Sequence, residues 1–310
     1  MNKFMQHIIS GKQFADRKLL EKILKRASVF ESADKKNKVP KLLKDKIVAC
    51  VFFEPSTRTR LSFETASLKL GAQVISVENA LASSSAYKGE TLEDTTKIIN
   101  GYADIFVLRH PESGAAERAS KVSKIPVINA GDGAKEHPTQ ALLDLYTIKK
   151  EHKKLENITL VFVGDLLYSR TIHSLLPLLA EYKNNKFVFV SPSKLALPKE
   201  YTKLLEEKGI EFSQSRDLDA SLSVADVVYM TRVQKERFES IADYNKVKDL
   251  FLLKRTHLKA LKKNAIIMHP LPRINEIDPE IDLDPRAAYF RQAKNGLYVR
   301  MAVLLESLGL

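Results

Sequence analysis

The chain has 310 residues, which is enough for two domains with separate hydrophobic cores. Its 44% hydrophobic and 28% charged residues are typical of a globular protein, and no apolar run approaches the ~20 residues of a membrane-spanning helix. A single cysteine, Cys50, excludes a disulfide framework and a cysteine zinc site. Residues 1–12 contain no signal-peptide hydrophobic region, so we expect a cytoplasmic protein.

The net charge of +12 permits two interpretations. A basic surface is typical of proteins that bind nucleic acid. The lysine-rich runs, such as residues 35–38, contain no interleaved aromatic residues, and such runs more often form a solvated face. A positive field can equally draw small dianionic substrates into a cleft. The charge alone does not decide between these interpretations.

The first half of the chain alternates between predicted strands and helices. The strands are expected at residues 47–53, 73–77, 104–108 and 126–129, and the helices at 17–30, 56–71, 91–102, 113–121 and 137–148. Residues 82–90 are typical of a polar surface loop and 131–133 of a turn. The charge-rich stretch 149–157 could close the first domain.

A second alternating series follows. Its strands are expected at 158–163, 186–190, 210–212, 225–230 and 265–268, with one helix at 170–182 and a last helix carrying Leu297, Met301, Leu304, Leu305 and Leu308. Alternation of this kind implies mostly parallel sheets. The predicted fold class is therefore α/β, with two domains that each contain a mostly parallel sheet flanked by helices.

The turn after the first strand predicts an anion site. Pro55 ends the strand, and Ser56 or Thr57 can cap the helix that follows. The first backbone N–H groups of such a helix point at one spot together with the positive end of the helix dipole. Arg58 adds a guanidinium there, which binds phosphate oxygens as a bidentate fork.

Polar and cationic side chains also follow the other predicted strands, where ligands bind in open α/β sheets. They are Arg109 and His110, then His137 and Gln140, then Asp165 and Arg170, then Arg232 and Gln234, and finally the run 269–273. No dinucleotide or nucleotide-triphosphate glycine motif, metal-ligand spacing or nucleophile elbow is present. We therefore expect positional and electrostatic catalysis with no cofactor, no metal and no covalent intermediate.

Six motifs taken together resemble the aspartate branch of the transcarbamoylase family. They are Ser56–Arg60, the loop Ser84–Glu90, His137–Gln140, Arg170 after Gly164–Asp165, Arg232–Gln234 and His269–Pro272. The resemblance runs from about residue 47 to the C-terminus. It implies a carbamoyl-phosphate-binding domain at 1–138 plus 295–310, to which the C-terminal helix returns, and an aspartate-binding domain at 139–294.

The resemblance also implies a role for each matched residue. For carbamoyl phosphate, the residues at the phosphate are Ser56, Thr57, Arg58 and Thr59, and those at the carbonyl oxygen are Thr59, Arg109 and His137. Gln140 binds the amide, Leu271 also belongs to this set, and Ser84 and Lys88 come from a neighbouring chain. For aspartate, they are Lys88, Arg170, Arg232, Gln234 and Pro272, with a cis Leu271–Pro272 bond and the carbonyls of Pro270 and Leu271 accepting from the reacting amines. Arg58, Thr59, Lys88, Arg109 and His137 are the expected catalytic residues.

Two features favour aspartate over ornithine as second substrate. Pro270 stands where ornithine enzymes usually carry cysteine, and Arg232 with Gln234 provides an arginine for a carboxylate. The resemblance further implies that Glu54 pairs with Arg237 when the domains close.

The implied reaction transfers the carbamoyl group of carbamoyl phosphate to L-aspartate, giving N-carbamoyl-L-aspartate and phosphate for pyrimidine biosynthesis. The general base stays open between His137 and the departing phosphate. The expected assembly is a homo-oligomer, a trimer by resemblance, without nucleic acid or membrane partners; a regulatory chain is not decided by the sequence. The alternatives are a transcarbamoylase for another amine and a basic, non-catalytic binding protein.

Overall fold

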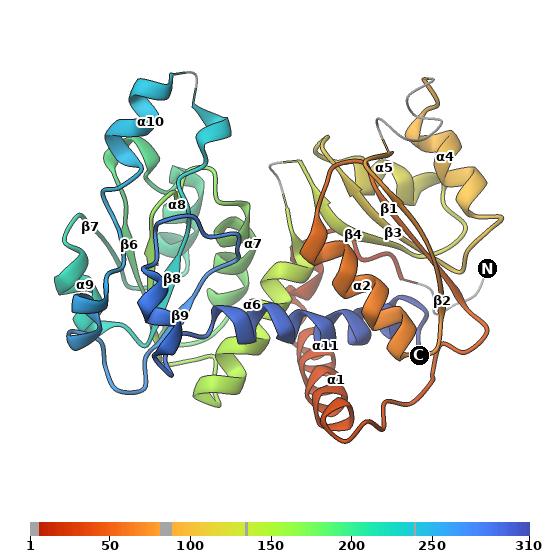
Figure 1. Ribbon diagram of the computed structural model, residues 1–310, viewed down its shortest axis with the longest axis horizontal. Coiled ribbons are helices and arrows are strands. Elements are labelled where there is room, and N and C mark those ends of the chain that lie inside the picture. The colour runs from red at the N-terminus through yellow and green to blue at the C-terminus, as the bar shows by residue number, and fades with distance from the viewer. Residues whose placement is uncertain (1–5, 81–88, 134–135, 239) are drawn as a thin grey trace. The chain divides into compact units, whose positions relative to one another are not determined.

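The computed structural model describes residues 6–80, 89–133, 136–238 and 240–310 (Figure 1). The chain forms two compact units, residues 1–146 with 294–310 and residues 147–293. The chain passes between the units within two helices, α6 (Pro138–His152) and α11 (Tyr289–Ser307). The sequence analysis had expected the division at 138/139 and 294/295.

The first unit contains a parallel four-stranded sheet in the order β2-β1-β3-β4. Its strands are β1 (Ile47–Phe52), β2 (Gln73–Glu78), β3 (Ile105–His110) and β4 (Val127–Asp132). Its helices are α1 (Arg17–Lys35), α2 (Thr57–Lys69), α4 (Leu92–Ile99), α5 (Ala115–Val122), the first part of α6 and the last part of α11. The two middle strands, β1 and β3, are buried almost throughout, whereas the edge strand β2 is mostly exposed.

Successive side chains of a strand point to opposite faces, which explains how apolar runs fill two layers. Ala49 and Val51 of β1 pack with residues of α4 and α5 in one hydrophobic cluster, while Val48 and Cys50 are buried on the other face. The last part of α11 lies against α1, because Lys22 forms an ion pair of 2.7 Å with Glu306. The predicted return of the C-terminal helix to the first domain is therefore confirmed.

The second unit contains a parallel five-stranded sheet in the order β7-β6-β5-β8-β9 (Figure 1). Its strands are β5 (Thr159–Val163), β6 (Lys186–Val190), β7 (Phe212–Ser215), β8 (Val227–Met230) and β9 (Ile266–Met268). Its helices are α7 (Arg170–Leu179), α8 (Lys199–Glu207), α9 (Leu218–Val224) and α10 (Ile241–Val247), besides the parts of α6 and α11 outside the first unit. Stacked rings of Phe162, Phe187 and Phe189 join the middle strands.

Five short 3-10 helices complete the described elements: η1 (Gly11–Ala15), η3 (Ser193–Leu195), η4 (Lys235–Arg237), η5 (Arg255–Lys259) and η6 (Pro279–Leu283). The predicted fold class, two α/β units with parallel sheets, is confirmed. In each sheet the strand order reverses between two neighbours, β1 and β3 in the first unit and β5 and β8 in the second. Ligands bind at such switch points, beyond the carboxyl ends of the strands.

Several local predictions were wrong. The charge-rich stretch at 149–157 was expected to form a break, but its first four residues belong to α6, which continues to His152. Gly131 and Asp132 belong to β4, where a turn was expected. The strand expected at 210–212 lies at Phe212–Ser215, and α1 extends beyond residue 30 to Lys35.

Candidate active site

The first turn of α2 lies directly beyond the carboxyl end of β1. Ser56 occupies the N-cap position, but its hydroxyl makes no capping hydrogen bond, contrary to the expected cap. The described first turn carries no acidic residue that would neutralise the positive end of the helix dipole. Much of Arg58 on this turn is open to solvent, but the protein covers part of its guanidinium and thereby lowers the pKa of that group. An arginine stays a cation at neutral pH. These features suit an anion, and the binding of phosphate at this turn stays a prediction.

Arg109 and His137 come together behind this turn. Arg109 is 8% exposed, donates to the carbonyl oxygen of Ala130 at 3.3 Å and forms an ion pair of 2.5 Å with Glu54. Gly131 leaves room for the arginine, because a Cβ on it would lie 2.8 Å from Nη1 of Arg109; the same Cβ would be in ordinary contact with Cδ2 of His137, at 3.6 Å. The φ of Gly131 is +122°, which also disfavours any other residue there.

Thr59, His137 and Gln140 are the other buried polar residues of this group. His137 immediately precedes α6, and Gln140 lies in its first turn, where Nε2 donates to Oδ1 of Asp144 at 2.9 Å. Glu136 anchors the approach to this helix, because its carboxylate accepts hydrogen bonds from the Ser10 hydroxyl at 2.9 Å and the backbone N–H of Gly11 at 2.6 Å.

We call this group the first-unit half-site. It comprises Ser56, Thr57, Arg58, Thr59, Arg109, His137 and Gln140. The structure brings these residues to the carboxyl ends of β1, β3 and β4, as the sequence analysis expected. Glu54 adds a carboxylate that the sequence had assigned to Arg237 of the other unit. Ser84 and Lys88, also predicted to act here, lie outside the described residues.

A second group lies beyond β5 and β8 in the other unit. Gly164 approaches Thr231 so closely that a Cβ would lie 2.3 Å from the Thr231 carbonyl oxygen. The Thr231 hydroxyl donates to the carbonyl oxygens of Val163 at 3.0 Å and Asp165 at 3.2 Å, which ties the two strand ends together. These contacts fix the backbone from which the neighbouring cationic side chains project.

Three predicted residues lie on this framework. Arg170 is the first residue of α7, Arg232 follows Thr231, and Gln234 donates from Nε2 to the carbonyl oxygen of Tyr168 at 3.1 Å. All three side chains are partly exposed. Two guanidinium groups and an amide in this position suit a ligand with more than one carboxylate.

The predicted Leu271–Pro272 cis bond is present, and Leu271 has a φ of +51°. His269 supports this bend, since Nδ1 accepts from the backbone N–H of Leu271 at 2.7 Å while Nε2 lies 2.7 Å from Oε1 of Glu276. Burial lowers the pKa of His269, so the neutral ring fits this pattern, with its proton on Nε2. Burial favours the protonated Glu276 carboxyl, but the hydrogen bond from His269 holds its pKa below the usual range.

We call Arg170, Arg232, Gln234, Leu271 and Pro272 the second-unit half-site. Sequence reasoning assigned no role to four buried groups beneath the half-sites: Asp144 and Arg300 in the first unit, and His269 and Glu276 in the second. His269 was visible in a matched motif, whereas the others carry no local signal. Arg237 lies in η4 of the second unit.

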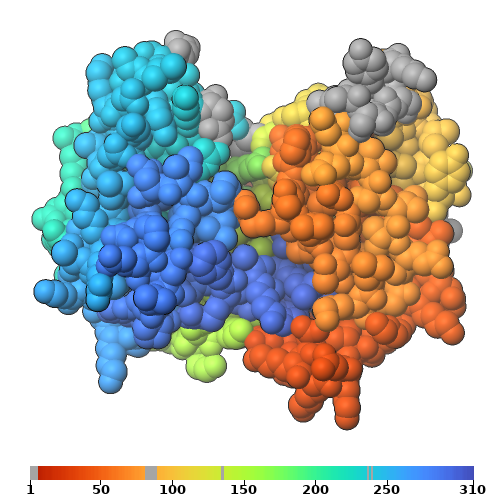
Figure 2. Space-filling view, viewed as in Figure 1, coloured from red at the N-terminus to blue at the C-terminus, as the bar shows by residue number. Residues whose placement is uncertain are grey.

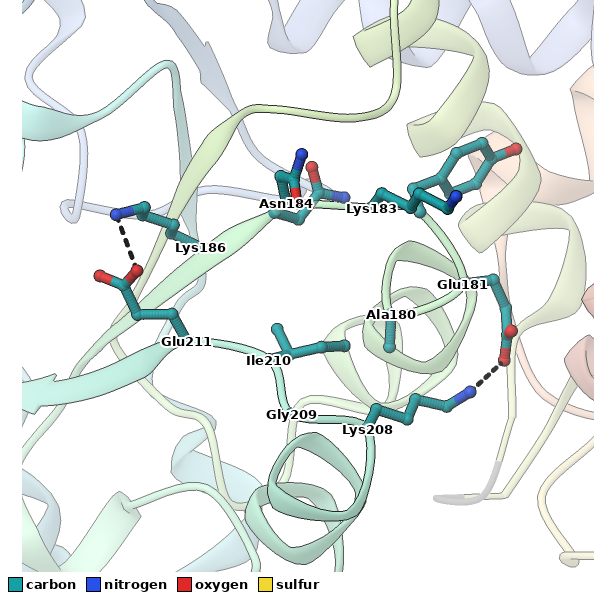
Figure 3. A pocket seen from close by; sticks show the side chains of 11 residues that line it. Ala180, Glu181, Lys183, Asn184, Lys186, Lys208, Gly209, Ile210 and Glu211 are labelled. Carbon is teal, nitrogen blue, oxygen red and sulfur yellow. Dashed lines mark hydrogen bonds and ion pairs between the residues drawn. The ribbon is translucent and has the colours of Figure 1, made fainter.

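A pocket of about 600 Å³ lies elsewhere in the second unit (Figure 3). The segments after α7 and α8 line it, at the amino ends of β6 and β7 and away from the second-unit half-site. Four of its five charged side chains form two pairs: Lys186 with Glu211 at 2.7 Å and Lys208 with Glu181 at 2.9 Å. Lys183 is the fifth, so the lining has one lysine more than it has carboxylates.

Within the described ranges, no three His, Cys, Asp or Glu side chains gather as metal ligands. In the same part of the chain, no helix combines the length and apolar character needed to cross a membrane.

Comparison with known proteins places the chain in a family. The model for the carbamoyl-P binding domain of aspartate/ornithine carbamoyltransferase matches residues 6–150, and the model for its Asp/Orn binding domain matches residues 156–306. An aspartate carbamoyltransferase catalytic subunit of Methanocaldococcus jannaschii is 50% identical over 300 residues, covering 97% of both chains. That of Vibrio campbellii is 47% identical, covering 97% of this chain and 96% of the relative.

Solved structures agree. The catalytic subunit of M. jannaschii aspartate transcarbamoylase superposes with a TM-score of 0.90 at 50% identity, covering 97% of both chains. Aspartate transcarbamoylase from Trypanosoma cruzi, in complex with carbamoyl phosphate and aspartate, gives a TM-score of 0.90 at 36% identity, covering 97% of this chain and 95% of that one. The chain therefore belongs to the aspartate/ornithine carbamoyltransferase family, among its aspartate carbamoyltransferases.

Proposed function

We propose that the protein transfers the carbamoyl group of carbamoyl phosphate to the amine of L-aspartate, giving N-carbamoyl-L-aspartate and phosphate for pyrimidine biosynthesis. The observation that carries the proposal is the pair of cationic half-sites, one at the switch point of each sheet. One contains a helix N-terminus suited to phosphate, and the other contains two arginines suited to carboxylates. Relatives at about 50% identity carry the corresponding name.

The first-unit half-site binds carbamoyl phosphate in this proposal. The phosphate accepts from the first N–H groups of α2, from the hydroxyls of Ser56, Thr57 and Thr59, and from Arg58. Ser84 and Lys88 of a neighbouring chain complete the phosphate site, and Lys88 also reaches aspartate. This arrangement is supported by the uncapped first turn and by its lack of acidic residues.

The carbonyl oxygen of carbamoyl phosphate lies against Arg109, His137 and Thr59. The amine of aspartate attacks the carbamoyl carbon, the carbonyl oxygen gains negative charge, and the bond from carbon to the bridging phosphate oxygen then breaks. The electron pair of that bond leaves with phosphate, while the proton lost by the amine passes to the phosphate or to His137. Donors at such an oxyanion act most strongly in the transition state, where losing one costs ~2.7–4 kcal/mol.

The second-unit half-site binds aspartate. Arg170, Arg232 and Gln234 hold its two carboxylates, and the carbonyl oxygens of Pro270 and Leu271 accept from the reacting amines. The bend at Leu271 and Pro272, supported by His269, sets the direction of these carbonyls. Contact between Glu54 and Arg237 in a closed form stays a prediction, as does a cytoplasmic location.

We also propose a homotrimer that shares its active sites. Leu61 and Leu68 of α2 are 48% and 57% exposed, and Ile75 and Val77 of the edge strand β2 are 43% and 36% exposed. The surface that includes α2 is coloured orange in Figure 2. Residues 81–88, which supply Ser84 and Lys88, follow this strand in the sequence. The two pairs lie on opposite faces of the sheet, because Ile75 and Val77 are in register with Ala49 and Val51, which pack towards α4 and α5. A second copy packed at this edge of the sheet would cover apolar side chains of both faces and bring Ser84 and Lys88 to a neighbouring site.

Phosphate release from carbamoyl phosphate by the purified protein tests the proposed activity, with L-aspartate or L-ornithine as acceptor. We expect release that depends on L-aspartate alone. Release with L-ornithine alone would overturn the role of Arg232 and Gln234. No release with either amine from folded protein would overturn the activity.

A further inference from the structure

Gln140 is held in one orientation by a buried carboxylate. Its Nε2 donates to Oδ1 of Asp144 at 2.9 Å, one helical turn further along α6. Asp144 is fully buried and Gln140 is 9% exposed. An ionised carboxylate only accepts hydrogen bonds, so it selects the NH₂ end of the Gln140 amide. The other end, Oε1, is then available as an acceptor.

The buried guanidinium of Arg300, in the same unit, favours the charged form of the Asp144 carboxylate. Arg300 of α11 is 3% exposed, lies over the Phe63 ring at 5.2 Å and donates to the Thr139 hydroxyl at 3.4 Å. Burial lowers the pKa of its guanidinium to about 10, and the charge of Asp144 acts in the opposite direction. Arg300 therefore remains a cation at neutral pH, and its charge favours the ionised form of Asp144.

Helix α11 leaves room for the Arg300 guanidinium at Gly296. A Cβ on Gly296 would lie 2.4 Å from Nη1 of Arg300 and 3.0 Å from Cδ2 of Leu143. Within the described chain, Nε of Arg300 has no hydrogen-bond partner, although burying an arginine in this way is costly. A neutral side chain would avoid that cost, so the buried charge needs a reason other than stability.

We propose that Asp144, supported by Arg300, is a specificity-determining positioning residue: it keeps Oε1 of Gln140 directed to the NH₂ group of carbamoyl phosphate. This inference rests on the proposed function, in which Gln140 binds that amide. The selected substrate feature is an acyl phosphate whose acyl group carries two N–H donors. Acetyl phosphate, which has a methyl group in place of NH₂, provides the matched probe.

The test compares the dissociation constants of carbamoyl phosphate and acetyl phosphate for wild type and Asp144→Asn. The asparagine has nearly the same shape but can donate, so Gln140 is free to turn its own NH₂ group outward. We expect carbamoyl phosphate to bind about fivefold to tenfold more weakly, as for one lost hydrogen bond, with acetyl phosphate almost unchanged. Equal weakening of both ligands would indicate a structural role and contradict the proposal.

Glu31→Gln is the matched control. Glu31 is 7% exposed and accepts from the Tyr146 hydroxyl at 2.7 Å, so it is a second buried acid that pairs with a side chain of α6. We expect this variant to retain the preference for carbamoyl phosphate. If Asp144→Asn does not fold, Asp144→Ser replaces it, because serine also donates; an unchanged preference in that variant would contradict the proposal.

A double-mutant cycle identifies the route of the effect. If Asp144 acts through Gln140, Asp144→Asn changes the ligand preference of wild type but not that of Gln140→Ala. Additive effects would contradict the proposal. The proposed function is judged separately, by aspartate-dependent phosphate release from wild type. An active wild type whose Asp144→Asn variant keeps its preference would overturn this inference alone.

Discussion

The Arg109 guanidinium lies 2.5 Å from the Glu54 carboxylate, so the arginine proposed to polarise the substrate carbonyl is already paired. Arg109 is 8% exposed, and the backbone N–H of Phe53, next to Glu54, donates to the Arg109 carbonyl at 2.8 Å. Side chain and backbone therefore connect the same two strand ends. In the proposed function, binding of carbamoyl phosphate at Arg109 competes with this ion pair.

Replacing Glu54 tests this competition. In Glu54→Gln the charge that attracts Arg109 is absent, so we expect carbamoyl phosphate to bind about two- to fivefold more tightly, the range for a partly exposed ion pair. We expect kcat to fall, because the same carboxylate is proposed to favour the closed form by a population shift. Equilibrium binding and steady-state kinetics measure the two effects. Weaker binding of carbamoyl phosphate would contradict the competition.

Arg232→Ala tests the second-unit half-site. The loss of one guanidinium should raise the KM for aspartate at least about tenfold, since a charged hydrogen bond contributes ~1.5–3 kcal/mol. The dissociation constant of carbamoyl phosphate should stay unchanged. Lys235→Ala, three residues further on and exposed, is the control and should leave both constants unchanged. Weaker carbamoyl phosphate binding in Arg232→Ala would argue against separate roles for the two half-sites.

Low pH should destabilise the protein through its buried histidines. Burial lowers the pKa of His269 below its ordinary 6.5, so below about pH 6.5 the unfolded chain takes up a proton that the folded chain does not. The free energy of unfolding therefore decreases as the pH falls from 6.5 towards the lowered pKa. His110, His152 and His173 change in the same direction.

His269→Asn isolates one of these groups. The slope of the unfolding free energy against pH is measured by urea denaturation between pH 7.5 and 5.5. We expect this slope to be smaller in the variant, by an amount equivalent to at most one bound proton. His257→Asn, which changes a partly buried histidine of η5, is the comparison for a general effect of substitution. An unchanged slope in His269→Asn would show that His269 is not kept neutral by the fold.

Mixed oligomers test the shared site. Chains with Arg58→Ala and chains with Lys88→Ala should each be almost inactive. If Lys88 acts in the site of a neighbouring chain, some sites in a mixed oligomer contain both native residues and regain activity. Oligomers verified to contain both chains but showing no gain would contradict sharing.

The sequence predicted the sheets and half-sites better than the connecting helices. The strand at Lys186–Val190 was predicted with its observed ends, because apolar residues fill most of it. The position of Arg58 in the first turn of a helix was predicted, because its motif follows a strand and opens a helix. The helices at Lys199–Glu207 and Ile241–Val247 were missed, since each is short and has a single buried residue.

The missed site residues have a different cause. The pair of Gln140 and Asp144 looks like any polar spacing on a helix, and Arg300 interrupts an apolar stripe without a local reason. Their roles arise from burial and from contacts between segments about 160 residues apart, such as Thr139 with Arg300. Pairing of Glu54 with Arg109 likewise depends on the register of β1 and β3.

The central claim is tested most directly by measuring the product itself. Purified wild type and Arg58→Ala would be incubated with carbonyl-labelled carbamoyl phosphate and L-aspartate, and labelled N-carbamoyl-L-aspartate quantified against phosphate released. Arg118→Ala, an exposed arginine elsewhere in the first unit, is the matched control. We predict that wild type and the control each form one N-carbamoyl-L-aspartate for every phosphate released. We predict a kcat at least ~100-fold lower for folded Arg58→Ala. Phosphate released without carbamoyl aspartate, or near-normal turnover by Arg58→Ala, would contradict the account.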